Sequence, residues 1–306
     1  MESWRKNPLV FWIVSIPPSA WLLGFFLIPL ALVWVMSFGE KRGIVEIAIT
    51  WTMENYFRAF DPLYLQIFLK SFWFAGLTTA VCFAAGFPIA IAITFAPSRW
   101  KPILLLLVIL PFWTNLLIRT YALIAVLRTR GFMNFTLEWL WEKGNAVLEF
   151  IGLGGYHLLG EQFQAFELLY NNFAVVFGLV YVHLPFMVLP LYAALDRMDR
   201  SYIEASLDLG AGQFRTFRSV IIPLALPGIV SGVIITFIPA LGSFLTPDLL
   251  GGTDSQMIAN VIERQFKSAN DWPFGAALSF ILMYITFFAL AVRALTARGK
   301  SIMEAA

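Results

Sequence analysis

The sequence predicts an all-α integral membrane protein with six membrane-spanning helices. Its 306 residues are 59% hydrophobic and only 13% charged, whereas soluble domains carry about a quarter charged residues. A helix needs about 20 mostly apolar residues to cross the hydrocarbon core of a bilayer. Six stretches of the chain meet this requirement: Leu9–Met36, Ile67–Ala96, Pro102–Leu127, Asn172–Leu195, Ser219–Thr246 and Pro273–Val292.

The first stretch follows two basic residues, Arg5 and Lys6, and so resembles a secretory signal. Signal sequences have an apolar region of only about 7–15 residues followed by a small-residue cleavage site. The apolar run here is far longer and no such site follows it. We therefore interpret it as an uncleaved first membrane span.

The remaining stretches carry features that are tolerated only in a helical bundle. Arg119 interrupts the third stretch near one end, where we expect its side chain to reach the lipid headgroups. Prolines inside the spans predict kinks, because neighbouring helices can satisfy the freed carbonyl groups. These prolines are Pro17, Pro18, Pro29, Pro88, Pro111, Pro185, Pro190, Pro227 and Pro239.

An even number of spans places both termini on one side of the membrane. The short loop Pro97–Lys101 and the tail after Val292 are almost purely basic. Short loops rich in Lys and Arg face the cytoplasm. We therefore expect both termini and the loop between the fourth and fifth spans to be cytoplasmic.

The external segment 128–171 is too apolar for a simple loop. The spacing of Phe132, Phe135 and Trp139 suggests short helices lying at the membrane interface, and the glycines at positions 152, 154 and 155 divide the segment. Two interpretations remain open, namely a cap over the bundle and a platform for an external partner.

Several classes of function lack the residues that they require. The six stretches contain no Asp or Glu, which argues against a carrier driven by an ion gradient, the more distant alternative. We find no nucleophile–base pair and no Walker-type phosphate loop, so we expect no enzymatic activity in this chain. Cys82 and the separated His157 and His183 suggest no metal site, and nothing indicates nucleic acid.

The cytoplasmic segment Asp196–Pro223 carries the most explicit local signals. Ser201 and Glu204 have the spacing of a capping box at a helix start. Gly210 is free to adopt the left-handed conformation that ends a helix. The segment thus predicts a helix of about two turns, and a second helix starting near Gln213 and continuing into the fifth span.

Such a short helix is marginally stable alone in water. It presents Ile203 and Leu207, with Phe214 nearby, and therefore needs a surface to lie on. From the residues alone, this surface is either the lipid headgroups or a partner protein.

The segment resembles the EAA loop of binding-protein-dependent ABC importer permeases. The family pattern is E-A-A, three residues, a glycine, nine residues, and then I-x-L-P. The chain has Glu204-Ala205-Ser206, then Gly210, then Val220-Ile221-Ile222-Pro223. It departs from the pattern at Ser206, Val220 and Ile222, where the changes in volume are small.

The resemblance implies a type I ABC importer permease fold and a loop, about 196–222, that inserts into a groove of a separate cytoplasmic ATPase. ATP and Mg²⁺ would bind to that ATPase, and this chain would hold no cofactor. Glu204 would cap the helix or pair with a basic residue of the ATPase. The expected coupling residues are Ser201, Ile203, Glu204, Ala205, Ser206, Leu207, Gly210, Phe214 and Pro223.

Other stretches resemble one branch of this family, the spermidine/putrescine permeases. They are LPFWTNLLIRTYA from Leu110, LPFMVLPLYAAL from Leu184, FIPALGSFLTPDLLGG from Phe237 and QFKSANDWPFGAALS from Gln265. The resemblance implies a polyamine as substrate. Opines, other amino-acid derivatives and ferric iron are the alternative substrates within the family.

A polyamine can pass along aromatic faces, because each cation–π contact contributes about 0.5–2 kcal/mol. Each aromatic residue can equally serve ordinary packing. Asp248 and Glu263 near the external mouth either attract a cation or are solvated loop charges. The expected pathway residues are Trp113, Asn115, Tyr121, Tyr181, Asp248 and Glu263.

We expect three parts: residues 1–66 with the first span and an external loop, a core of residues 67–295 with five spans, and a cytoplasmic tail of residues 296–306. The resemblance implies four kinds of partner. They are a second homologous permease, two copies of an ABC ATPase, a periplasmic solute-binding protein and membrane lipid.

Overall fold

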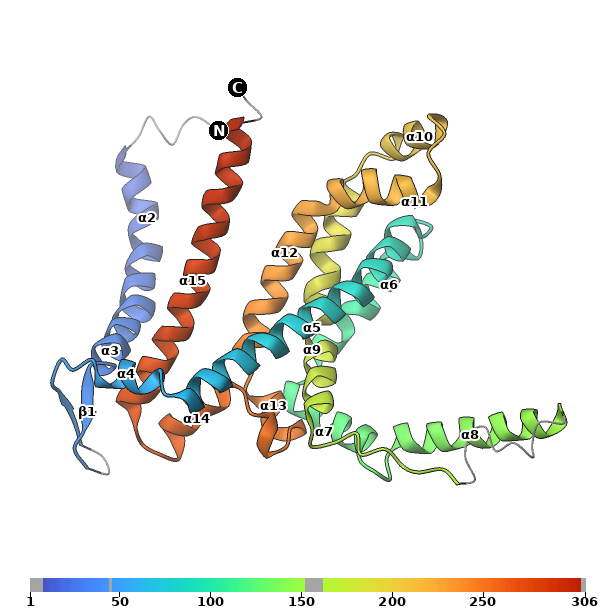
Figure 1. Ribbon diagram of the computed structural model, residues 1–306. Helices are drawn as coiled ribbons and strands as arrows, with labels where there is room; N and C mark the ends of the chain where they lie inside the picture. The colour runs from blue at the N-terminus through green and yellow to red at the C-terminus, as the bar shows by residue number, and fades with distance from the viewer. Residues whose placement is uncertain (1–7, 44–45, 152–161, 304–306) are drawn as a thin grey trace. The chain divides into compact units, whose positions relative to one another are not determined.

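The computed structural model describes residues 8–43, 46–151 and 162–303, and these residues are mainly helical (Figure 1). Five helical segments are long and apolar enough to cross a membrane, and a sixth candidate is a pair of helices bent by 96°. The five segments are Val10–Met36, Pro62–Phe95, Asn172–Asp196, Gln213–Leu241 and Trp272–Ala291, and the bent pair is Lys101–Trp113 with Leu116–Phe150. Five of the six predicted spans are therefore helical, and the third is a broken pair of helices.

The first span consists of two helices, α2 (Pro8–Leu22) and α3 (Ile28–Met36), joined by a π turn, η1 (Leu23–Leu27). Pro29 is the second residue after this turn. Because proline has no amide hydrogen, it cannot complete the usual helical bond to the carbonyl four residues earlier. The widened turn is one way in which a helix accommodates this missing bond.

A small β-hairpin follows the first span, and the sequence patterns did not predict it. Strand β1 (Gly39–Lys41) pairs antiparallel with β2 (Ile47–Ile49), with Glu40 opposite Ala48. The helix α4 (Glu54–Ala59) comes next. The described residues between the first and second spans thus form a hairpin and a short helix.

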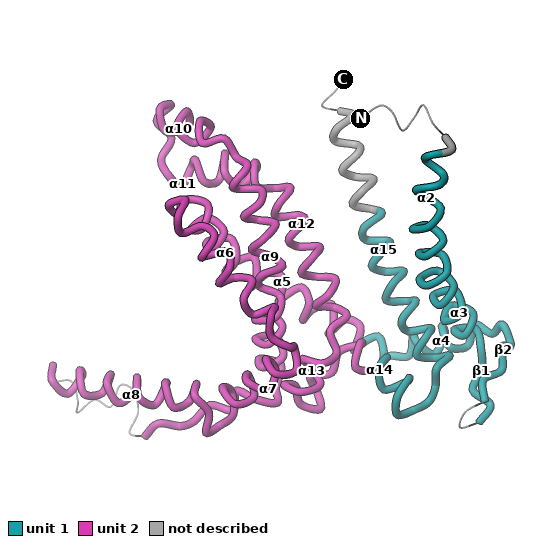
Figure 2. Tube along the Cα trace, turned by 180° about the vertical axis from the view of Figure 1, so that it is seen from behind, with its two compact units in different colours: residues 1–66, 261–306 teal, residues 67–260 magenta. Residues whose placement is uncertain are grey.

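Contacts divide the chain into two compact units, coloured separately in Figure 2: residues 1–66 with 261–306, and residues 67–260. In this division the last span, α15 (Trp272–Met303), groups with the first span. Residues 296–303, expected as a tail, continue this helix.

Polar contacts fix α15 to the other parts of its unit. Within this unit, α2 begins and α15 ends at the same end (Figure 1), as an even number of spans requires. Three contacts join the region of residues 34–58 to residues 269–284: Trp34 Nε1 donates to the Tyr284 hydroxyl at 2.7 Å, Lys41 Nζ donates to the Ala269 carbonyl at 2.6 Å, and Arg58 pairs with Asp271 at 2.7 Å.

The second unit is built around three spans, α5 (Pro62–Phe95, from Ile67 onward), α9 (Asn172–Asp196) and α12 (Ile222–Leu241). Gly228 and Gly232 of α12 face α9. A Cβ at Gly228 would collide with Ala194, and one at Gly232 would lie 2.8 Å from the Met187 sulfur. Small residues four apart allow helix backbones to approach closely in a membrane. The fully buried core between these spans contains Cys82, Ala90, Met187, Val188, Leu191 and Ala225.

The third predicted span is broken, where one helix over Pro102–Leu127 was expected. The chain forms α6 (Lys101–Ile109) and a 3₁₀ turn, η2 (Leu110–Trp113), and then α7 (Leu116–Leu127). Thr114 and Asn115 are extended, and the Asn115 side chain accepts a hydrogen bond from the Leu117 amide at 2.8 Å. The asparagine therefore caps a new helix, which points in a different direction.

In segment 128–171, which was expected to be external, the described residues form one long helix in place of the expected short ones. The helix α8 (Phe132–Phe150) has 19 residues and runs through Gly144. The glycines at 152, 154 and 155 and His157 lie outside the described residues. Short elements complete this end of the unit: α13 (Leu245–Leu250), η5 (Thr253–Ser255) and the start of α14 (Ile258–Lys267).

Candidate functional site

The segment between α9 and α12 has the predicted secondary structure. The helix α10 (Ser201–Asp208) has eight residues, and Gly210 beyond it has a φ of +82°. A φ in this range favours glycine over every other residue. The second helix, α11 (Gln213–Thr216), begins at the expected position.

The predicted capping box is not formed. The Ser201 side chain makes no cap to the helix amides. Instead, Asp199 Oδ1 accepts a hydrogen bond from the Ser201 amide at 2.9 Å. The Ser201 amide and hydroxyl both donate to this carboxylate and hold the pKa of Asp199 below its usual value. The turn that starts the helix is thus held by an aspartate two residues earlier, which sequence reasoning missed.

Two contacts tie α10 to the rest of the second unit. The hydroxyl groups of Ser206 and Thr216 lie 3.0 Å apart, and Thr216 is only 3% exposed. Ile203 is half-buried against the core cluster of the spans. The helix is therefore connected directly to the core.

The chain continues from α11 into the fifth span without a break in the helix. A π turn, η4 (Phe217–Ile221), joins α11 to α12, and Pro223 lies in the first turn of α12. Phe217 packs edge-on against Phe87 of α5, with ring centroids 5.7 Å apart. A displacement of α11 would therefore be passed to a membrane span and to its neighbour.

The other end of the α10 segment is fixed where α9 ends. Asp196 pairs with Lys101 at the start of α6, at 2.6 Å. The Arg200 guanidinium lies 5.5 Å from the ring centre of Phe95, the last residue of α5. Both connections of α10 thus begin at packed ends of spans.

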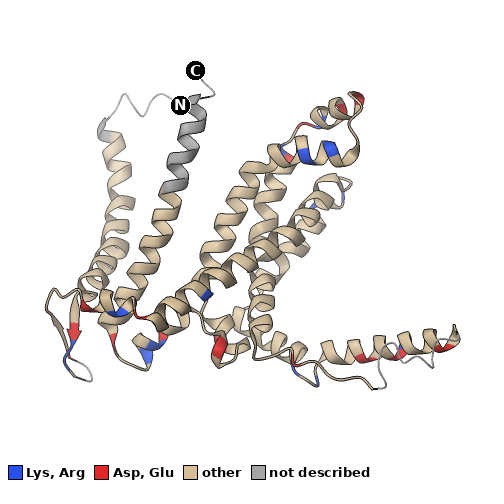
Figure 3. Cartoon of the chain, viewed as in Figure 1, with Lys and Arg blue, Asp and Glu red and all other residues tan. Residues whose placement is uncertain are grey.

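The outer side of this segment is apolar and open. We define the α10 surface as Tyr202, Leu207, Leu209 and Phe214, all of which are exposed, Leu209 by 88% and Phe214 by 76%. Charged residues surround it, as Figure 3 shows for α10 and α11. The exposed charged residues are Glu204, Asp208, Arg215 and Arg218.

The expected pathway residues of the broken span lie near its break. Trp113 ends η2 and is 75% exposed, and Tyr121 on α7 is 58% exposed. Asn115 lies between them and uses its side-chain oxygen to cap α7. Two large aromatic faces and one amide group are therefore open for contact around this turn.

Arg119 does not extend outward as expected. It lies on the side of α7 that also carries the buried Thr120 and Leu123, and its guanidinium is 5.8 Å from the ring centre of Phe112. Its Nε and Nη1 are shielded from solvent and have no hydrogen-bond partner in the part of the chain that the structure describes. The expected snorkelling was wrong, because the break in the span turns this face of α7 inward.

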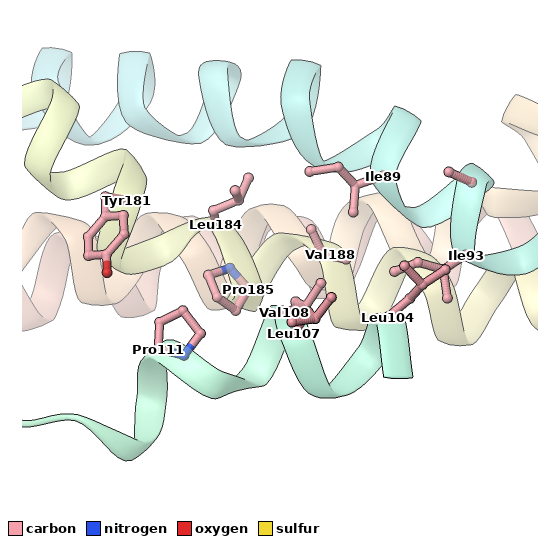
Figure 4. Close-up of a pocket in the computed structure, with 11 residues that line it drawn as sticks. Ile89, Ile93, Leu104, Leu107, Val108, Pro111, Tyr181, Leu184, Pro185 and Val188 are labelled. Atoms are coloured by element: carbon pink, nitrogen blue, oxygen red, sulfur yellow. The ribbon is translucent and has the colours of Figure 1, made fainter. Parts of the chain in front are cut away.

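Tyr181 lines an apolar cavity of about 360 Å³ between α5, α6 and α9. Figure 4 shows its side chain beside Pro111, with Leu184 and Pro185 further along the same wall. The other lining residues are aliphatic: Ile89, Ala92, Ile93, Leu104, Leu107, Val108 and Val188. The Tyr181 hydroxyl is the one polar side-chain group among these lining residues.

The two acidic pathway residues fall in different units. Asp248 is exposed on α13 in the second unit. Glu263 belongs to the first unit, where it pairs with Lys267 at 2.6 Å. An ion pair reduces the negative charge that Glu263 can offer to a cation.

The sequence is similar to curated permeases over most of its length. It is 38% identical over 265 residues to the spermidine/putrescine transport system permease protein PotB of Escherichia coli (strain K12), covering 87% of this chain and 90% of that protein. It is 39% identical over 272 residues to PotB of Haemophilus influenzae, covering 88% of both.

The fold also resembles a solved transporter. A bacterial ABC transporter that imports the acidic polysaccharide alginate contains a chain that superimposes with a TM-score of 0.67 at 15% identity, covering 95% of this chain and 96% of that one. Residues 85–301 match the family described as binding-protein-dependent transport system inner membrane component. The chain therefore belongs to this family, as a multi-pass inner-membrane ABC permease with the type I importer fold.

Proposed function

We propose that this chain carries a polyamine across the inner membrane and is driven by a separate ATPase that docks on the α10 surface. The observation that carries the docking is the exposure of Leu207, Leu209 and Phe214 on a segment of two short helices. Fully burying a Leu or Phe side chain contributes about 1.5–3 kcal/mol. An ATPase groove that covers these side chains would stabilise a helix that is too short to be stable alone.

The connections of α10 suggest how a movement of the ATPase reaches the membrane. A push on α10 passes through the contact between Ser206 and Thr216 to α11, and then through the π turn to α12. The close packing at Gly228 makes α9 follow α12. Closure of two ATPase subunits on ATP would in this way rock the permease from inward-facing to outward-facing.

The proposed assembly contains this chain, a second homologous permease, two ATPase subunits and a periplasmic solute-binding protein. ATP and Mg²⁺ bind to the ATPase subunits, and this chain holds no cofactor and no metal. A related arrangement supports this proposal, because a bacterial alginate ABC transporter of the same fold has been solved with its periplasmic protein bound.

The ends of the second unit differ in charge in a way that supports a cytoplasmic α10 (Figure 3). Basic residues gather at the α10 end, and short basic segments face the cytoplasm. They are Arg99, Lys101, Arg197, Arg200, Arg215 and Arg218. Glu138, Glu142 and Glu149 lie on α8 at the opposite end. We accordingly place the termini and α10 inside and α8 outside.

A polyamine is the substrate that the relatives favour, because PotB permeases belong to spermidine/putrescine systems. The exposed faces of Trp113 and Tyr121 suit a flexible cation, which they would bind weakly enough to release. The cavity at Tyr181 offers a cation only one polar side-chain group. We therefore place the polyamine contacts at the turn between η2 and α7.

The docking and the orientation are tested together by labelling single cysteines in a Cys82→Ala background. A membrane-impermeant maleimide should label Leu209→Cys only in inside-out vesicles stripped of ATPase, and restoring the ATPase should protect it. Glu142→Cys is the matched control and should be labelled only from the opposite side. Labelling of Leu209→Cys that the ATPase leaves unchanged would refute docking at this surface.

The substrate is tested by uptake of labelled putrescine and spermidine. Cells that lack this chain should lose saturable uptake, and the wild-type chain should restore it. Trp113→Ala should weaken uptake, whereas Trp113→Phe, which keeps an aromatic face, should retain most of it. Unchanged polyamine uptake in the deletion strain would remove this substrate from consideration.

A further inference from the structure

The helix α8 has three distinct faces along its length. Large apolar residues are exposed on one face, and Phe150 reaches 93% exposure. At 100° per residue, this face lies within about two fifths of the helix circumference. It contains Phe132, Phe135, Trp139, Leu140, Val147 and Phe150.

An acidic strip borders this apolar face on one side. Glu138, Glu142 and Glu149 all project within a narrow sector of the helix and are exposed. A strongly polar strip beside an apolar face is typical of a helix that lies at the boundary between water and hydrocarbon.

The third face is covered by the returning chain. Asn134 is only 3% exposed and exchanges two hydrogen bonds with the Phe166 backbone, at 2.8 and 2.9 Å. Trp141 packs near Phe163, with ring centroids 6.4 Å apart. The covered face shows that α8 has its own packed support, so its exposed apolar face is a separate surface.

The direction of α8 fits the plane of a membrane. The helices after the break are bent by 96° from α6, and α8 runs sideways from the end of the second unit's spans (Figures 1 and 2). A helix perpendicular to the spans at their ends lies at the level of the lipid headgroups.

The residue types on the open face match that level. Trp139 combines an apolar ring with an N–H donor, a combination that favours the interface. The Lys143 ammonium lies 6.0 Å from the ring centre of Trp139 and is the one basic group in the sequence of α8. Such a lysine can extend from an apolar face to a lipid phosphate.

We propose that α8 is an interfacial membrane helix that inserts its Phe132–Phe150 apolar face among the phospholipids of one leaflet. The aromatic side chains contact the upper acyl chains, the acidic strip faces water, and Lys143 binds lipid phosphate. The leaflet is the outer one, an assignment that rests on the orientation in the proposed function.

The test places a spin label at single cysteines in the assembled transporter, reconstituted in nanodiscs of phosphatidylethanolamine and phosphatidylglycerol. Phe135→Cys, Trp139→Cys and Phe150→Cys report on the apolar face. Glu138→Cys, Glu142→Cys and Glu149→Cys are matched controls on the same helix. Collisions with oxygen report contact with lipid, and collisions with a water-soluble nickel chelate report contact with water.

Oxygen collisions should exceed nickel collisions several-fold on the apolar face, and the ratio should reverse on the acidic strip. Equal exposure of both faces to nickel would overturn the proposal. So would protection of the apolar face from both reagents, which indicates a protein neighbour. The readout does not depend on which side is labelled, so it can fail while the proposed orientation and function hold.

Discussion

The α10 segment and α8 are both amphipathic, lie outside the spans and stand at opposite ends of the second unit (Figure 1), yet they are connected to it differently. The α10 segment is short and continues through a π turn into α12. The helix α8 is longer and leads into a return chain that packs against it. The first arrangement can pass a displacement to a span, whereas the second holds α8 against its own return chain.

The largest expected effect comes from Gly210, the residue that sets the direction of α10. Gly210→Val should lower ATP-dependent transport in proteoliposomes by about tenfold or more, because a left-handed conformation costs an L-residue about 1–2 kcal/mol and a β-branched residue more. Space is not the cause, since nothing lies within 4 Å of a Cβ at this position.

Gly212→Val is the matched control, since Gly212 has the same open space but a φ of −69°. It should retain transport. Gly210→Asn should lie between the two, because asparagine tolerates the left-handed conformation. Equal amounts of each variant in the membrane must be confirmed. Full transport by Gly210→Val would show that the geometry of this loop does not matter for coupling.

A smaller effect is expected at Thr216, which joins α10 to α11. Thr216→Val keeps the shape but removes the contact with Ser206, worth about 1 kcal/mol or about a fivefold change in an equilibrium. The number of ATP molecules hydrolysed per polyamine transported should rise severalfold. Ser219 is an exposed residue on the adjoining π turn, and Ser219→Ala should leave this ratio unchanged. An equal rise in the ratio for Ser219→Ala would show that the Thr216 contact has no specific role in coupling.

The fold was predictable where many consecutive residues indicate the same structure. Apolar runs of more than 20 residues have one physical solution in lipid, so all six spans could be located from the sequence. Gly210 was predictable for a similar reason, because few residues other than glycine end a helix in this way. The continuation of α11 into the fifth span followed from the apolar stripe of Phe214, Phe217 and Ile221.

The helix start at Asp199, the hairpin and the position of Arg119 could not be predicted, because the local sequence is compatible with more than one structure. Asp199 and Ser201 both have side chains suited to a helix start, and in the structure Asp199 accepts the hydrogen bond there. The strands of the hairpin have three residues each, too few for a periodic pattern. Arg119 lies inward only because Asn115 starts a new helix, and a straight span had been assumed.

For α8, a change that loosens its support should spare transport. Asn134→Ala removes two hydrogen bonds to Phe166 and one to the Thr129 carbonyl, which should release residues 162–171 from the helix. Limited proteolysis of the complex should then cut this chain much faster, while coupled uptake falls by less than about twofold. Asn145→Ala, a half-buried position on the same helix, should change neither. A tenfold loss of uptake in Asn134→Ala would mean that α8 takes part in coupling.

The smallest expected effect concerns pH at the start of α10. Hydrogen bonds from Ser201 lower the pKa of Asp199. The stabilisation by these hydrogen bonds is therefore fully present above the pKa of the unfolded chain, about 3.9. It is lost only as the pH falls through the lower pKa of the folded protein. Between pH 5 and 8 the carboxylate stays ionised. Asp199→Asn, which keeps an oxygen acceptor, should therefore show the same pH profile of coupled transport as the wild type over this range, with a slightly lower level throughout. Asp199→Ala removes the acceptor and should lower the level further. If the pH profiles of Asp199→Asn and the wild type differ between pH 5 and 8, then Asp199 exchanges a proton during transport. A residue that only holds the start of α10 by hydrogen bonds would not do so.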